Sequence, residues 1–179
     1  MFTFASPLII GASGGIGAAV AARLPSAATL SRREDSLDIT DEASISAAAA
    51  KFKGQAFDLI FVATGVLESD GARPEKSFAE LNAEAMARVY AANAIGPALV
   101  FKHFAPLLPP DRRSVVAFLS ARVGSIGDNR LGGWMSYRAS KAALNQIVRC
   151  ASIELARTRP DAVALALHPG TIDTALTRK

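Results

Sequence analysis

Short apolar runs recur along the chain and alternate with stretches of helical character. The runs occupy residues 8–10, 28–30, 57–62, 114–119 and 162–167. Continuous apolar runs of this length are typical of strands that are buried on both faces, and such strands occur in parallel sheets. The stretches between them, residues 16–24, 42–52, 78–107 and 136–158, predict helices. The alternation predicts an α/β fold with a doubly wound parallel sheet.

Two segments depart from a regular alternation. Pro97 lies in the long stretch 78–107 and predicts a break in that helix at Pro97 or nearby. Residues 31–38 are too few for a crossover helix, so we expect the second strand to lead into a loop or a stub of strand. The 179 residues contain no repeat or linker, which predicts a single domain over 1–179.

The composition excludes several classes of protein. The single cysteine, Cys150, excludes an internal disulfide framework and a cysteine-based zinc site, and two histidines make no case for another metal. The net charge of +4 is small and the arginines are scattered, so we expect no nucleic-acid partner. No apolar stretch approaches the roughly 20 residues of a membrane span, and no secretory signal is recognisable. We therefore expect a cytoplasmic protein without a membrane partner.

A glycine cluster, GASGGIG at residues 11–17, follows the first predicted strand and opens the first predicted helix. Glycines let the chain turn tightly there and let backbone N–H groups at a helix N-terminus approach a pyrophosphate. The spacing is G-x-x-x-G-x-G, so the common G-x-G-x-x-G dinucleotide fingerprint is not matched. Alone, the cluster fits either a dinucleotide site or a glycine-rich turn without a ligand.

Tyr137 and Lys141 lie four residues apart in the last predicted helix. This spacing places both side chains on one face of the helix. An ammonium beside a phenol stabilises the phenolate, so we expect Lys141 to lower the pKa of Tyr137 from its ordinary value of about 10. Tyr137 would then serve as an acid or base near neutral pH. An isolated pair of this kind also occurs on plain helix surfaces.

The glycine cluster and the Tyr137–Lys141 pair, in this order, resemble the short-chain dehydrogenase/reductase family. The sequence is most similar to the family's C-factor-like, carbonyl-reductase-like branch, and the resemblance covers nearly the whole chain. Further matching segments are the adenine-binding segment at residues 38–40, Gly65 at the end of a segment that is usually Asn-Asn-Ala-Gly, Asn93, and the Pro-Gly segment at residues 168–174. The resemblance implies a Rossmann-like three-layer sandwich that binds ligands at the carboxyl ends of its strands.

The resemblance also implies an activity, the NAD(P)-dependent interconversion of a small-molecule carbonyl and alcohol. Tyr137 would be the acid or base, Lys141 would assist it, Asn93 would anchor a water behind Lys141, and Ser120 would orient the carbonyl. The residues assigned to the cofactor on this basis are Gly11, Ser13, Gly15, Ile16, Gly17, Asp38, Ile39, Gly65, Asn93, Tyr137, Lys141, Pro169, Gly170, Ile172 and Thr174. Members of the family are usually homodimers or homotetramers.

Two departures from the family pattern bear on this expectation. The catalytic serine is usually the second residue of a Ser-Ser pair, but the pair here is Ser120-Ala121, and Ser125 is the other nearby hydroxyl. The family also continues past the Pro-Gly segment, so we expect the C-terminal strand and lid to be missing from these 179 residues, or the sequence to be incomplete. Both departures leave room for a catalytically silent dinucleotide-binding protein with a signalling or structural role.

The end of the second predicted strand indicates which dinucleotide is bound. Chains that prefer NAD carry an acidic residue there, about 20 residues after the first glycine, which bonds the ribose hydroxyls. This chain instead has Ser31, Arg32 and Arg33. A guanidinium presents a planar fork that suits a phosphate dianion. We therefore expect NADP(H) over NAD(H), with Arg32 at the 2′-phosphate and Ser31 assisting.

Overall fold

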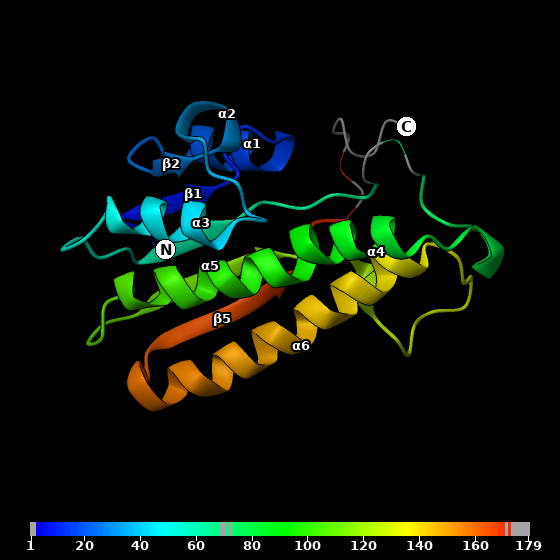
Figure 1. The fold of residues 1–179 in the computed structure, drawn as a ribbon. Helices are drawn as coiled ribbons and strands as arrows, with labels where there is room; N and C mark the ends of the chain where they lie inside the picture. Colours follow the sequence, from blue (N-terminus) through cyan, green and yellow to red (C-terminus); the bar gives the residue numbers. More distant parts are fainter. Residues whose placement is uncertain (1–2, 69–70, 72, 171, 173–179) are drawn as a thin grey trace.

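The computed structural model describes residues 3–68, 71, 73–170 and 172. Its five strands form one parallel sheet in the order β2-β1-β3-β4-β5. Figure 1 shows β2 beside β1 at one side of the sheet and β5 at the other. The strands are β1 (Pro7–Ile10), β2 (Ala28–Leu30), β3 (Leu59–Val62), β4 (Ser114–Leu119) and β5 (Ala162–Leu167). The chain leaves β1 for one neighbour and returns to form β3 on its other side, so the carboxyl ends of β1 and β3 flank a topological switch point.

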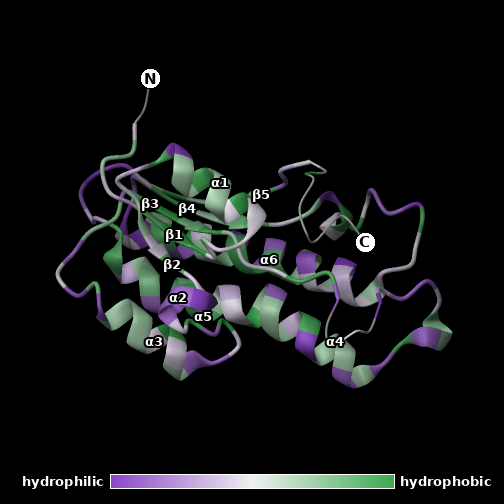
Figure 2. Cartoon of the chain, turned by 90° about the horizontal axis from the view of Figure 1, so that it is seen from above, coloured by the Kyte–Doolittle hydropathy of each residue, from purple (hydrophilic) through white to green (hydrophobic). Residues whose placement is uncertain are grey.

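Helices cover both faces of the sheet and complete three layers. Apolar side chains of α1 (Gly15–Arg23) pack on one face, against a small cluster around Ile9 and Phe61. The other face carries the larger core, to which α3 (Glu42–Ala50), α5 (Gly96–Phe104) and α6 (Met135–Thr158) contribute. Figure 2 shows the apolar strands between these two layers. The predicted Rossmann-like α/β fold is confirmed.

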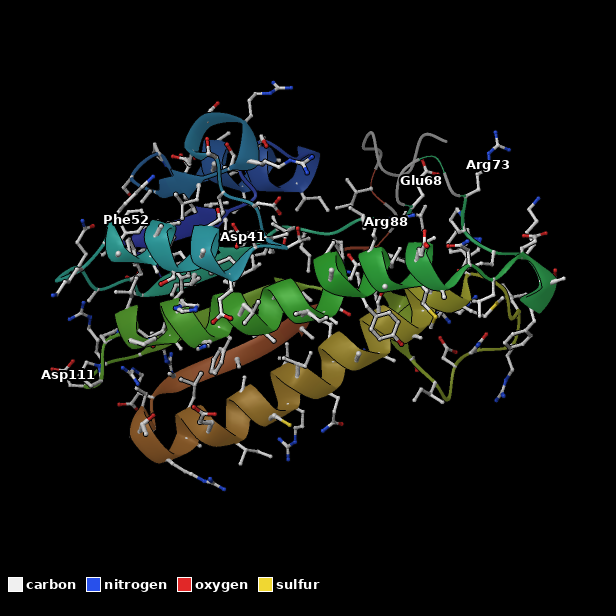
Figure 3. All side chains as sticks on the ribbon, viewed as in Figure 1. Asp41, Phe52, Glu68, Arg73, Arg88 and Asp111 are labelled. Atoms are coloured by element: carbon white, nitrogen blue, oxygen red, sulfur yellow. The ribbon has the colours of Figure 1, made fainter. Side chains whose placement is uncertain are left out.

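The segment 31–38 differs from the prediction of a loop or strand stub. It contains the one-turn helix α2 (Arg32–Asp35), which Ser31 caps by accepting a hydrogen bond from Glu34 N–H at 3.1 Å. The crossover from β2 to β3 is made by α3, whose cap Asp41 accepts from Ala43 N–H at 3.0 Å (Figure 3). The segment is too short for a crossover helix, as expected, but the prediction of a loop or strand stub was wrong, because a serine cap stabilises even a single helical turn.

The long middle stretch is not broken at Pro97. Helix α4 (Ala83–Tyr90), a π-helical turn (Ala91–Ile95) and α5 follow one another without interruption. Gly96 N–H donates to Ala91 O, and Pro97 then occupies the first turn of α5, where proline is tolerated. The irregularity that the proline predicted is therefore a π turn directly before it.

The outer strand β5 is the least covered part of the sheet. Val163, Leu165 and Leu167 remain 44%, 39% and 37% exposed, while Ala162 and Ala164 pack on the core beneath α6. Within residues 3–68, 71, 73–170 and 172, no strand pairs with the outer edge of β5. No helix in this part of the chain is long and apolar enough to cross a bilayer.

Candidate active site

The glycine cluster forms the turn from β1 into α1 at the switch point. Gly11 adopts φ +89°, a left-handed conformation that favours glycine, and its N–H donates to Leu30 O at 2.8 Å. A Cβ atom on Gly17 would lie 2.9 Å from the carbonyl carbon of Gly11, so α1 starts this close to the turn only with glycine there. Ser13, Gly14 and Gly15 are exposed at this edge of the sheet.

The first turn of α1 fits a phosphate group. Its N-cap residue, Gly14, provides no side-chain cap, and no acidic residue lies in the first turn. The first N–H groups of a helix have no partner within the helix, and the helix dipole favours an anion there. The cradle of small residues and uncapped N–H groups therefore fits the pyrophosphate of a dinucleotide.

Asn93 joins three elements beside this edge. It lies fully buried in the π turn, and its Oδ1 accepts a hydrogen bond from Val66 N–H at 2.8 Å. Its Nδ2 donates to Val66 O at 2.8 Å and to Ser140 Oγ at 3.1 Å. A Cβ on Gly65 would lie 3.2 Å from both Asn93 Oδ1 and Lys141 Nζ. The structure thus brings Asn93, Gly65 and Lys141 together, although they are distant in sequence.

Tyr137 and Lys141 occupy the first two turns of α6 and lie on its inner side. Lys141 Nζ donates to Leu119 O at 2.8 Å and lies 5.9 Å from the centre of the Tyr137 ring. Burial lowers the pKa of Lys141 to about 8 because the charged ammonium loses water. Gly124 packs against the same turn, where a Cβ would lie 2.9 Å from Lys141 Cβ.

The expected depression of the Tyr137 pKa is not found. Burial raises the pKa of the phenol, because the phenolate would be poorly solvated. The ammonium of Lys141 is bound to Leu119 O, and no lowering contribution from it offsets the burial. Tyr137 therefore stays protonated at neutral pH in this structure, and its ring makes an edge contact with Trp134 at 6.4 Å between centroids.

The hydroxyl groups near the end of β4 differ in their partners. Ser120 is buried, and its Oγ donates a hydrogen bond to Asn145 Oδ1 on α6 at 2.7 Å. Ala121, the residue in the usual catalytic position, follows in an extended conformation. Ser125 Oγ accepts a hydrogen bond from Asp128 N–H at 3.3 Å, which leaves its own proton available. Asn145 had no recognisable role in the sequence.

The expected dinucleotide-selecting residues lie at the end of β2. Ser31 is buried, whereas Arg32 is exposed on α2 and forms no ion pair among residues that the structure describes. Asp38 accepts hydrogen bonds from Thr40 Oγ1 at 2.7 Å and Thr40 N–H at 2.8 Å. These bonds, with a smaller contribution from the charge of Arg32, lower the pKa of Asp38. Arg32 and Asp38 therefore share one surface.

The remaining predicted residues follow β5 and β2. Pro169, Gly170 and Ile172 are exposed beyond the carboxyl end of β5, and Gly170 adopts φ +81°. Thr174 lies outside the described residues. Ile39 packs against the π turn, where a Cβ on Gly96 would lie 2.6 Å from Ile39 Cγ1.

A cavity of about 370 Å³ lies on the flank of α6. Phe78, Ser125 and Arg138 contribute to its lining, whereas Tyr137 and Lys141 do not. The cavity is therefore adjacent to the predicted catalytic pair and separate from it. Among the described residues, no three His, Cys, Asp or Glu side chains are grouped closely enough to hold a metal ion.

Sequence reasoning missed one buried charge near the site. Glu75, in the loop after β3, is buried, and its carboxylate accepts hydrogen bonds from Ser136 at the start of α6. The two residues are 61 positions apart, so no local pattern in the sequence marks the pair.

Known proteins share sequence and fold with this chain. A family model described as enoyl-(acyl carrier protein) reductase matches residues 18–179. The 1-hydroxy-2-glutathionyl-2-methyl-3-butene dehydrogenase of Rhodococcus sp. (strain AD45) is 34% identical over 148 residues, 81% of this chain and 61% of that protein. The C-signal protein of Myxococcus xanthus is 42% identical over 90 residues, 50% of this chain and 52% of that protein.

Solved structures include a putative short-chain dehydrogenase/reductase from Burkholderia multivorans with bound NADP. It matches with a TM-score of 0.84 and 28% identity, over 98% of this chain and 83% of that one. The chain belongs to the short-chain dehydrogenase/reductase family, as the sequence motifs predicted. It spans only 61% and 52% of the two curated relatives named above.

Proposed function

We propose that the protein is an NADP(H)-dependent oxidoreductase that interconverts a small-molecule carbonyl and its alcohol. The observation that carries the proposal is the meeting of Tyr137, Lys141 and Asn93 beside the exposed glycine turn at one edge of the sheet. These side chains come from α6 and the π turn, and the contacts of Asn93 hold the two together. The family relationship and the NADP-bound structure from B. multivorans support the same activity.

In the direction of reduction, Tyr137 supplies a proton to the developing alkoxide. The raised pKa of the phenol keeps that proton in place at neutral pH, so this direction needs no prior ionisation. Lys141, with a pKa of about 8, is largely protonated at pH 7 and places a positive charge near the Tyr137 ring. When bound, the dinucleotide supplies the hydride. Asn93 holds the loop after β3 and α6 in register while the proton moves.

The group that orients the substrate carbonyl is proposed to be Ser120, which must first exchange its bond to Asn145 for one to the substrate. Ser120→Ala should then lower turnover by about 10²-fold, the loss typical of one oriented donor. Ser125→Ala is the matched control, since Ser125 offers a free proton on the same segment. A larger loss in Ser125→Ala than in Ser120→Ala would transfer the role to Ser125.

Arg32 provides the basis for the preference for NADP(H). Its guanidinium is exposed on the surface that also carries Asp38, where the adenosine half of the dinucleotide is proposed to lie. A hydrogen bond to a charged group contributes roughly 1.5–3 kcal/mol, which corresponds to about 10- to 100-fold in affinity. Arg32→Ala should weaken NADPH binding by that factor and leave NADH binding unchanged. Arg33→Ala, on the same turn of α2, is the control, and an equal loss in both variants would refute the assignment.

A panel of aldehydes and ketones tests the proposed activity against its alternative. Ala121 in the usual serine position supports an alternative in which the protein binds a dinucleotide without turnover, and the similarity to a protein named C-signal supports a signalling role for that alternative. The oxidoreductase should oxidise NADPH with at least one carbonyl class, followed by the loss of its near-ultraviolet absorbance. Tight NADPH binding without oxidation by any carbonyl would favour the signalling alternative.

A further inference from the structure

A carboxylate is buried where the loop after β3 meets the start of α6. The loop carries Glu68 and Arg73 at the end of the sheet opposite Asp111 (Figure 3), and Glu75 follows them in the chain. Glu75 is 7% exposed. A buried carboxylate is costly unless hydrogen bonds and a favourable charge surround it. The surroundings of Glu75 therefore indicate what it does.

Both carboxylate oxygens of Glu75 bind the first turn of α6. Oε1 accepts a hydrogen bond from Ser136 Oγ, and Oε2 accepts one from Ser136 N–H at 3.3 Å. The backbone carbonyl of Glu75 also accepts from Trp134 N–H. Trp134 itself is in the left-handed conformation and offers no side-chain cap to the helix. Glu75 thus takes the place of the missing cap, and its negative charge lies at the positive end of the helix dipole.

The first turn of α6 depends on Glu75 more than the second turn does. The second turn is held by Lys141, which binds Leu119 O, and by Ser140, which is fully buried and bonded to Asn93. Tyr137 lies in the first turn, directly after Ser136, and is only half-buried. Loss of the Glu75 contacts would therefore let the helix start fray and move the phenol while Lys141 stays in place.

We propose that Glu75 is a positioning residue that acts through Ser136 to hold the hydroxyl of Tyr137 at its working place. The inference rests on the proposed function, in which Tyr137 transfers the proton. On this proposal the position of the Tyr137 hydroxyl depends on Glu75 in the loop after β3 as well as on α6. A displacement of about 1 Å of a catalytic group can cost about 10²-fold in rate.

Three variants separate positioning from general stability. Glu75→Ala should lower kcat by about 10- to 100-fold with the KM for NADPH unchanged, because the glycine turn and Arg32 are not altered. Glu75→Gln keeps one acceptor for Ser136 and should restore most of the rate. Glu80→Ala is the control, since Glu80 is exposed on the same segment and its carboxylate binds only Lys76 N–H within the described part of the chain.

A second readout does not depend on turnover. The chain has two tyrosines, Tyr90 and Tyr137, so tyrosine labelled with ¹³C at the ζ carbon alone gives two signals in NMR spectra, and Tyr137→Phe assigns them. Glu75→Ala should shift or broaden the Tyr137 signal and leave that of Tyr90 in place. Wild-type turnover in Glu75→Ala, or equal movement of both signals with lost NADPH affinity in Glu75→Ala and Glu75→Gln, would overturn the proposal. If the wild type oxidises no NADPH, the proposed function fails and the tyrosine signals still decide the role of Glu75.

Discussion

Lys141→Met should remove a rise in stability that the unliganded protein shows above neutral pH. Lys141 is 3% exposed, and burial lowers its pKa from the ordinary 10.5 to about 8. The folded protein therefore releases this proton near pH 8, whereas the unfolded chain keeps it up to about pH 10.5. Between these two values the unfolded state binds more protons, so the free energy of unfolding increases with pH. Below pH 8 both states carry the charge and the contribution is constant.

The size of the effect follows from the two pKa values. At about 1.4 kcal/mol per pKa unit, the full window corresponds to roughly 3 kcal/mol, of which about 2 kcal/mol falls between pH 7 and pH 9.5. Methionine replaces the lysine with an unbranched side chain that carries no charge. Other groups titrate alike in both proteins, so the wild type minus the variant isolates Lys141.

Urea unfolding followed by the fluorescence of Trp134, the single tryptophan, measures this difference. The wild type should gain about 2 kcal/mol relative to Lys141→Met between pH 7 and pH 9.5. The same pH dependence in both proteins, or a wild type that loses stability relative to the variant, would refute the burial of a poorly solvated ammonium at this position.

Three further substitutions, with Gly14→Ala as the control for one of them, test the scaffold around the site. Asn93→Ala leaves the bonded groups of the loop and α6 unpaired, and urea unfolding should show a loss of about 2–3 kcal/mol. Gly17→Ala forces a methyl group against Gly11, so calorimetry should show NADPH binding weakened by at least about tenfold. Gly14→Ala is the control, because its new Cβ would lie 3.4 Å from Gly11 O, an ordinary contact distance, and NADPH binding should persist. Asp58→Ala removes the acceptor of two N–H groups before β1 and should cost about 3 kcal/mol with NADPH affinity unchanged.

Periodicity was enough to predict the sheet. The five apolar runs became the five strands. The inner strands β1 and β3 are apolar along their whole length because both of their faces are covered, whereas β5 leaves one apolar face exposed among the described residues. The helical turn α2 within residues 31–38 could not be predicted in this way. It is stabilised by the cap between Ser31 Oγ and Glu34 N–H, and no hydrophobic pattern marks it. The π turn before Pro97 was also not predicted, because π-helices are rare and occur mostly as single turns inside helical stretches such as this one.

The site could be predicted only where its residues form a local motif. The Tyr137–Lys141 spacing and the glycine cluster are such motifs, and the family they indicated is confirmed. The direction in which the pKa of Tyr137 shifts could not be predicted, because it depends on burial and on the hydrogen bond from Lys141 to Leu119 O. Glu75 was missed for the same reason, since its contacts exist only once two distant segments have packed.

Tyr137→Phe tests the central claim most directly, because it removes one hydroxyl and preserves the ring. NADPH oxidation with the most reactive carbonyl of the panel should fall by about 10²–10⁴-fold, the contribution expected of a general acid. The dissociation constant of NADPH, measured on the same protein, should stay at the wild-type value. Turnover close to that of the wild type in Tyr137→Phe would contradict the assignment of Tyr137 as the proton donor.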